Sequence, residues 1–381
     1  MSQVVDLLQQ LVSIPSVNPD GDPGCPPEQT GEEDLADFVA GTLSARGFQI
    51  ILEEILPGRP NLIARAPGPD DRPRIFFGPH SDTVGVGGMT IDPFGAEISD
   101  GRLWGRGASD TKGPMAAMLW GLIENADLLP ELPVAVDFVA FMSEESSQFG
   151  SRHFAEHHAN RYEFALVGEP TNLDFVHVTK GSLWATLTAS GKAAHSSQPE
   201  RGENAILKLG RALDHLNRKY TARLATFTHP VLGHATFNVG TITGGTRANI
   251  VPDHAQAQID IRTVPALAEG EGALKHLEAF LQESALPVAV VNPHENPPME
   301  VATDHSWLKR LCTICPTAKL VGAPWFSDAA HLGAAGLPAV CVGPGSIDQA
   351  HTADEFISID DLEAGASFFS SLVRGLADPA G

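Results

Sequence analysis

The sequence predicts an α/β fold: a mostly parallel sheet flanked by helices and interrupted by a smaller α+β, ferredoxin-like domain. Short apolar strands alternate with helices up to residue 178 and again after residue 291, which is typical of a parallel sheet covered on both faces. Between them lie strands of alternating polarity and two amphipathic helices. We therefore expect one domain from residues 1–178 and 292–381, and a second from residues 179–291.

The first domain begins with an expected amphipathic helix in residues 30–48, with a capping box from Thr30 to Glu33 and a stop at Gly47. The elements that follow are the strand RIFFGPH (74–80), the helix TKGPMAAMLWGLIEN (111–125), the strand VAVDFVAFM (134–142), the helix SRHFAEHHAN (151–160) and the strand FALVGEP (164–170). After the second domain, the apolar strands KLVGA (319–323) and PAVCVG (338–343) resume the pattern, and a helix ends the chain.

The second domain runs in the order strand, helix, strand, strand, helix, strand. Its segments are GSLWATLTASG (181–191), NAILKLGRALDHLNRKY (204–220), ATFNVGTITGG (235–245), HAQAQIDIRTV (254–264), ALKHLEAFLQE (273–283) and PVAVVN (287–292). Because alternation places the apolar side chains of a strand on one face, we expect an antiparallel sheet that the two helices cover on that face.

Composition excludes some partners. The formal net charge of −22 opposes binding to nucleic acid or to an anionic membrane, so we expect neither as a partner. No window holds the roughly 18 uninterrupted apolar residues of a membrane span. The first residues, MSQVVDLLQQLVS, carry an acid and no basic region, so we expect no secretory signal and a cytoplasmic location.

Side chains of metal-ligand type stand at the ends of the predicted parallel strands or just before a helix. They are His80, Asp82, Asp110, Glu144, Glu145, Glu169 and, near the C-terminus, His351. In open α/β sheets, ligands bind beyond the carboxyl ends of the strands, where these side chains would converge. Each has an ordinary alternative, because Asp110 and Glu169 also suit helix caps and His80 and His351 also suit solvent-exposed positions.

A set of imidazoles and carboxylates favours zinc or a similar ion over calcium or magnesium. Five ligands, with one carboxylate as a bridge, predict two ions. Asp82 would orient His80 from behind. Consecutive extended residues point to opposite sides, so we expect Glu145 to be a ligand and Glu144 a general base that takes a proton from water. The alternative is that the strand before the two glutamates simply reaches solvent.

Several motifs together resemble one family. They are HSDTV (80–84), DPF (92–94), DGRLWGRGASDTKG (100–113), SEES (143–146), VGEPT (167–171), HSSQPERGENAI (195–206), NIVPD (249–253) with DIR (260–262), and GPGSIDQAHTADEF (343–356). This set is similar to that of the dinuclear zinc peptidases and deacylases, a family that includes deacetylases, desuccinylases, aminoacylases and carboxypeptidases. The similarity runs from the N-terminal helix to the C-terminus. It implies that the second domain is a lid through which the protein forms a homodimer.

The resemblance implies a role for each site residue. Asp110 would bridge two zinc ions, for which cobalt or manganese would be able to substitute, and the peptide bond from Asp110 to Thr111 would be cis. One ion would take His80 and Glu169, and the other Glu145 and His351, with Glu144 as the base and Asp82 behind His80. His195 would polarise the scissile carbonyl, in cis or in a partner subunit. Asn249 and Arg262 would bind the substrate.

The substrate class implied is an N-acyl amino acid. HSSQPERGENAI and GPGSIDQAHTADEF are closest to the acetylornithine deacetylases, so N-acetylornithine is the first expectation, which would place the enzyme in arginine biosynthesis. RANIVPD (247–253) is closer to the succinyl-diaminopimelate desuccinylases and aminoacylases, which keeps those activities and a dipeptidase activity open. A remote alternative is a non-catalytic binding protein that kept the fold and lost the metals.

Overall fold

The computed structural model describes residues 2–20 and 24–378. It divides into two compact units, the first formed by residues 1–177, 301–321 and 327–381, the second by residues 178–300 and 322–326. The boundary expected after residue 291 falls inside a strand, β16 (Ala289–Asn296), which pairs with its neighbour up to Asn296, and the second unit therefore extends further. In the described part of the chain, no helix is both long and apolar enough to cross a membrane.

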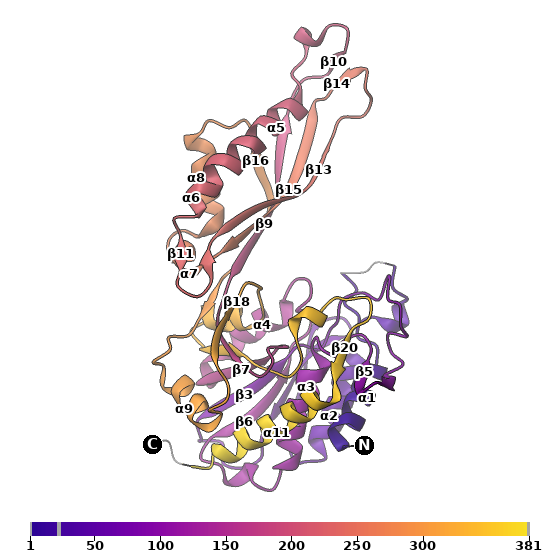
Figure 1. Cartoon of the computed structure of the whole chain (residues 1–381), viewed down its shortest axis with the longest axis vertical. Helices are drawn as coiled ribbons and strands as arrows, with labels where there is room; N and C mark the ends of the chain where they lie inside the picture. Colours follow the sequence, from indigo (N-terminus) through magenta and orange to yellow (C-terminus); the bar gives the residue numbers. More distant parts are fainter. Residues whose placement is uncertain (1, 21–23, 379–381) are drawn as a thin grey trace. The chain divides into compact units, whose positions relative to one another are not determined.

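The first unit is built on a mixed sheet whose central strands are parallel (Figure 1). The order is β1 (Gln49–Leu56), β2 (Arg59–Arg65), β6 (Ala135–Ala140), β3 (Arg74–Pro79), β7 (Phe164–Gly168), β19 (Ala339–Cys341), β8 (Phe175–Thr179) and β17 (Met299–Glu300), with β18 (Leu320–Ala323) also paired to β8. β3 runs parallel to both β6 and β7, and β19 runs parallel to β7. The predicted α/β fold is therefore confirmed.

Helices cover both faces of this sheet, as neighbouring residues of β3 demonstrate. Phe76 packs against Phe154 of α4 (Phe149–His157), with ring centroids 5.1 Å apart. Phe77 packs against Phe369 of α11 (Ile359–Gly375), also at 5.1 Å. Because successive strand residues point to opposite faces, α4 and α11 lie on opposite sides of the sheet. α3 (Lys112–Glu124) and α1 (Gln3–Ser13) pack with α11.

The second unit is a four-stranded antiparallel sheet in the order β13 (Thr236–Gly244), β15 (His254–Thr263), β9 (Gly181–Ser190) and β16. With α5 (Ala205–His215) after β9 and α8 (Gly272–Glu283) after β15, this is the expected ferredoxin-like arrangement. Leu183 and Leu187 of β9 are buried beneath the helices, whereas Trp184 is 47% exposed on the other face. Alternation along the strand thus separates the apolar face from the open one.

The predicted capping box is absent. α2 (Glu33–Ser44) begins at Glu33, and the Thr30 hydroxyl donates a hydrogen bond to the carbonyl of Pro27, 2.8 Å away. Glu32 is fully buried, where its carboxylate accepts two hydrogen bonds from Arg59 and one from the N–H of Ser143. The start of α2 therefore anchors the loop after β6, a tertiary contact that a local capping pattern does not reveal.

Candidate metal centre at the strand ends

The first group of candidate ligands joins the ends of two parallel strands to the turn before α3. His80 follows β3, Glu169 follows β7, and Asp110 comes shortly before α3. One ligand atom from each of the three residues lies within 4.8 Å of the others, and all three side chains are buried. His80 Nε2 is 3.1 Å from Asp110 Oδ1.

The second group shares Asp110 with the first. It adds Glu145, from the loop after β6, and His351, near the C-terminus. His351 Nε2 lies 3.0 Å from Glu145 Oε2 and 3.5 Å from Asp110 Oδ2. Asp110 therefore presents one carboxylate oxygen to each histidine, which is the geometry of a bridging ligand. Glu145 Oε1 is buried and has no hydrogen-bond partner among the described residues.

Asp82 lies behind this cluster. His80 Nδ1 is 2.9 Å from the carbonyl oxygen of Asp82 and 3.4 Å from its carboxylate. Neither oxygen is able to donate, so Nδ1 carries a proton and Nε2 is the ring atom that faces the cluster. The Asp82 carboxylate also accepts hydrogen bonds from the Asn18 amide and from the N–H groups of Glu144 and Glu145. It therefore fixes both a histidine and the backbone of the two adjacent glutamates.

The carboxylates of the cluster are too crowded to be ionised together without a cation. Burial raises the pKa of Glu144 and that of Glu169 well above the usual range, and their anionic neighbours add to the effect. Burial and Asp110 raise the pKa of Glu145 to about 7. Without ions, the site therefore holds protons, which a divalent cation would displace.

The histidines carry the opposite charge in this ion-free state. Burial alone would lower the pKa of His80, but contacts with Asp110 and Asp82 outweigh it and raise the pKa well above its usual range. Asp110 and Glu145 raise the pKa of His351 to about 10. Two imidazoles, three carboxylates and an orphaned carboxylate oxygen fit a pair of borderline divalent ions that share Asp110.

The turn that carries Asp110 is held by Glu355, a residue that the strand-end pattern did not select. Its buried carboxylate accepts hydrogen bonds from the N–H groups of Gly107, Ser109 and Asp110 and from the guanidinium of Arg106. The Asp110–Thr111 peptide is cis, as the resemblance implied. Glu355 lies four residues after His351, within the same motif, but the sequence does not reveal which groups its carboxylate contacts.

Asp328 is a second acid that the pattern missed. It is fully buried, accepts a hydrogen bond from the Ser151 hydroxyl, and precedes α10 (Ala329–Ala334). Burial raises the pKa of Asp328 to about 7, and the Glu145 charge contributes to that rise. In the sequence WFSDAAH, it is indistinguishable from a helix cap.

The remaining predicted residues belong to the second unit. His195 lies on β10 (Ala194–His195), which pairs with β14 (Ile250–Val251), so His195 is beside Asn249. His195 Nδ1 accepts a hydrogen bond from the N–H of Ser197 at 3.1 Å, which leaves the ring proton on Nε2. Arg262 lies near the far end of β15 and donates from Nε and Nη2 to Asp260.

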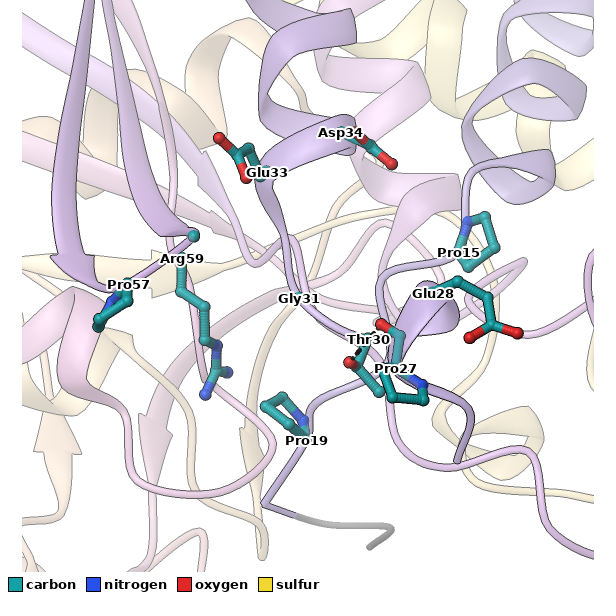
Figure 2. Close-up of a pocket in the computed structure, with 11 residues that line it drawn as sticks. Pro15, Pro19, Pro27, Glu28, Thr30, Gly31, Glu33, Asp34, Pro57 and Arg59 are labelled. Carbon is teal, nitrogen blue, oxygen red and sulfur yellow. Dashed lines mark hydrogen bonds between the residues drawn. The ribbon is translucent and has the colours of Figure 1, made fainter. Parts of the chain in front are cut away.

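A separate cavity of about 340 Å³ in the first unit shares no residue with the ligand groups (Figure 2). Its walls are formed by prolines, acids, two glycines, one threonine and one arginine: Pro15, Pro19, Pro27, Glu28, Thr30, Gly31, Glu33, Asp34, Pro57, Gly58 and Arg59. The guanidinium of Arg59 is already paired with Glu32 and Asp20. Among the described residues that line it, this cavity therefore offers no free cation for an anionic ligand.

Similarity to known proteins agrees with this geometry. Residues 76–375 match the family model for peptidase family M20/M25/M40. An acetylornithine deacetylase of Proteus mirabilis is 31% identical over 392 residues, which cover 97% of this chain and 96% of the relative. An M20 family metallo-carboxypeptidase, Sso-CP2 from Sulfolobus solfataricus, superposes with a TM-score of 0.79 at 20% identity, over 99% of this chain and 100% of that one.

A further structural neighbour is YXEP of Bacillus subtilis, described as a dinuclear metal-binding peptidase of the M20 family. It has a TM-score of 0.69 at 14% identity and covers 98% of both chains. At such low sequence identities, similarity to the solved structures supports the fold alone. The family model and the 31% identical relative also establish the family: this chain belongs to peptidase family M20/M25/M40 and is a hydrolytic enzyme.

Proposed function

We propose that this protein is a dinuclear zinc hydrolase that removes the acyl group from an N-acyl amino acid, with N-acetylornithine as the first candidate substrate. The observation that carries the proposal is the pair of ligand groups that share Asp110, with the half-buried Glu144 preceding Glu145 in the chain. The acetylornithine deacetylase of Proteus mirabilis supports the choice of substrate. The proposal includes a homodimer and a cytoplasmic location.

His80 and Glu169 would hold one ion, Glu145 and His351 the other, and Asp110 both. Bound there, two divalent ions supply Lewis acidity that polarises the amide carbonyl and makes water more acidic. The Glu144 carboxylate takes a proton from the attacking water and gives it to the leaving amine, so that the amide and water become a carboxylic acid and an amino acid. With ions held by the neighbouring residues, Glu144 would experience a smaller rise in its pKa and would be able to act as a base near pH 7.

The second unit would supply the substrate contacts. His195 has its proton on Nε2 and is therefore able to donate a hydrogen bond to the carbonyl oxygen, where negative charge develops. Asp260 occupies the Nε–Nη2 edge of the Arg262 guanidinium, which leaves the Nη1–Nη2 edge for the substrate α-carboxylate. Asn249, beside His195, would add an amide.

Within one subunit, His195 and Arg262 are too far apart for the same small substrate. At one end of the strand pair, Ser190 of β9 pairs with His254 of β15, and β10 with His195 follows just after Ser190 in the chain. At the other end, Ser182 of β9 pairs with Arg262. The nine steps from Asp253 to Arg262 span about 30 Å at roughly 3.3 Å per residue. Figure 1 shows the same separation, with β10 at one end of this unit and α7 (Pro265–Ala268), which follows β15, at the other. The proposal therefore assigns His195 to the partner subunit's substrate.

The substrate is tested with a panel of N-acetyl, N-succinyl and N-formyl amino acids and dipeptides, assayed with zinc, cobalt or manganese. N-acetylornithine should give the highest kcat/KM. A preference for N-succinyl-diaminopimelate or for a dipeptide would keep the chemistry and replace the substrate. Failure to hydrolyse any amide in metal-loaded protein would contradict the proposal.

Two substitutions separate proton transfer from metal binding. Glu144→Gln should lower kcat by about 10²–10⁴-fold with unchanged metal content, because the amide is not basic. Asp110→Asn should instead release metal, because its carboxylate serves both ligand groups. Metal analysis and steady-state kinetics of both variants make the comparison, and a Glu144→Gln enzyme within about tenfold of wild type would refute the base assignment.

Subunit mixing tests the assignment of His195. The His195→Ala and Glu144→Ala variants should each be nearly inactive. If His195 acts in trans, random exchange makes half of the dimers mixed, each with one complete site, so that activity should recover to about a quarter of wild type. No recovery, in subunits whose exchange is demonstrated by differently tagged chains, would refute action in trans.

The carboxylate clamp is tested by comparing a free-acid substrate with its amide. Wild type should prefer the acid, and Arg262→Lys should lose most of that preference with a raised KM, since a single ammonium does not reproduce the guanidinium fork. Arg247→Lys, in the exposed loop before Asn249, is the matched control and should keep the preference. An Arg262→Lys enzyme with undiminished preference would show that another group holds the carboxylate.

A further inference from the structure

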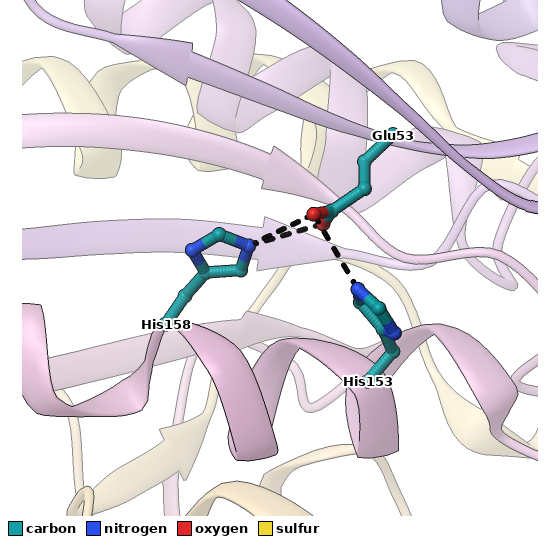
Figure 3. A group of neighbouring side chains, drawn as sticks. All are labelled: Glu53, His153 and His158. Carbon is teal, nitrogen blue, oxygen red and sulfur yellow. Dashed lines mark hydrogen bonds and ion pairs between the residues drawn. The ribbon is translucent and has the colours of Figure 1, made fainter.

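The first unit contains another cluster of metal-ligand side chains, Glu53, His153 and His158, which shares no residue with the candidate metal centre (Figure 3). Glu53 lies on β1, His153 on α4, and His158 directly after α4. Both imidazole rings point at the one carboxylate in Figure 3. The proposed hydrolysis uses none of the three.

The distances fit one small ion. His158 Nε2 lies 3.2 and 3.1 Å from the two oxygens of Glu53, and His153 Nε2 lies 3.4 Å from Oε1. One ligand atom from each of the three residues lies within 4.8 Å of the others. Two ligand atoms of a tetrahedral zinc ion, each at about 2.0–2.2 Å from the metal, are roughly 3.4 Å apart.

Access and charge also suit a cation. The side chains of His153, His158 and Glu53 are 32%, 16% and 28% exposed, so an ion is able to enter and to keep one position for solvent. The anionic chain, with a net charge of −22, raises the local concentration of cations.

The end of α4 makes this convergence possible. On a continuous α-helix, residues five positions apart point about 140° away from each other. α4 ends at His157, and His158 leaves the helical conformation with φ −128° and ψ −19°. That departure turns His158 toward Glu53, which His153 approaches from within the helix.

We propose that Glu53, His153 and His158 form a third metal site, for zinc or a similar borderline divalent ion. The ion ties the C-terminal end of α4 to β1, an edge strand of the large sheet. Its role is therefore structural: α4 begins just after the loop that carries Glu144 and Glu145, and the ion stabilises the end of the helix farther from that loop.

Metal counting on the whole protein tests the site with Zn²⁺ or Co²⁺ alone as the probe, at buffered free-ion concentrations. Wild type should bind one equivalent more than Glu53→Gln and one more than His158→Gln, whatever the other centre binds. Loss of a ligand should weaken the third site by at least about 100-fold, since even outer partners of a ligand change affinity by 10–100-fold. Equal stoichiometry and affinity in wild type and both variants would overturn the proposal.

His157→Gln is the matched control. His157 stacks on His153 with centroids 4.1 Å apart and bonds through Nδ1 to the carbonyl of His153, outside the ligand group. The His157→Gln protein should bind as many ions as wild type. Loss of one equivalent of metal in this variant would overturn the assignment of Glu53, His153 and His158 as the ligands. As a second measurement, zinc should raise the thermal unfolding midpoint of wild type and His157→Gln more than that of the Glu53 and His158 variants. Equal zinc-induced shifts in all four proteins would overturn the tie between α4 and β1.

Discussion

The geometry of the candidate centre depends on one buried carboxylate, that of Asp82. It accepts hydrogen bonds from the side-chain amide of Asn18 and from the backbone N–H groups of Glu144 and Glu145, and it lies against the ring of His80. Burial opposes its ionisation, but these contacts outweigh burial and lower the pKa of Asp82. Asp82 therefore remains a charged acceptor for these backbone donors. The same carboxylate orients the candidate ligands His80 and Glu145 and the expected base Glu144.

Around Asp82 the site is electrostatically incomplete by itself. Burial and neighbouring carboxylates raise the pKa values of Glu144, Glu145 and Glu169, and contacts with Asp110 and Glu145 raise that of His351. A fold that buries so many like charges loses stability unless cations arrive. Two divalent ions would replace the bound protons and satisfy the orphaned oxygen of Glu145. Metal loading of this site would therefore be linked to the release of protons.

Sequence alone was sufficient wherever a side chain's position follows from the direction of a strand. The ends of β3, β6 and β7 lie at one edge of a parallel sheet, so the convergence of His80, Glu145 and Glu169 was predictable. The positions of Glu355 and Asp328 were not predictable. Their hydrogen-bond partners, Asp110 and Ser151, are 245 and 177 residues away in the chain, and the local pattern of a sequence does not reveal such distant contacts. The Thr30 capping box was wrong for a related reason, since Glu32 is committed to Arg59 instead.

In the proposed dimer, the second unit would extend the site beyond one chain. Its edge strand β13 leaves a row of backbone donors and acceptors without a neighbouring strand in the sheet of the described residues, and Ile242 on it is 56% exposed. Pairing such an edge with its own copy about a two-fold axis is the simplest closed solution. In the proposed dimer, the distance along β15 that separates His195 from Arg262 is then no obstacle, because each substrate meets Arg262 of one subunit and His195 of the other. A site shared in this way would reconcile the length of the second unit with a small substrate.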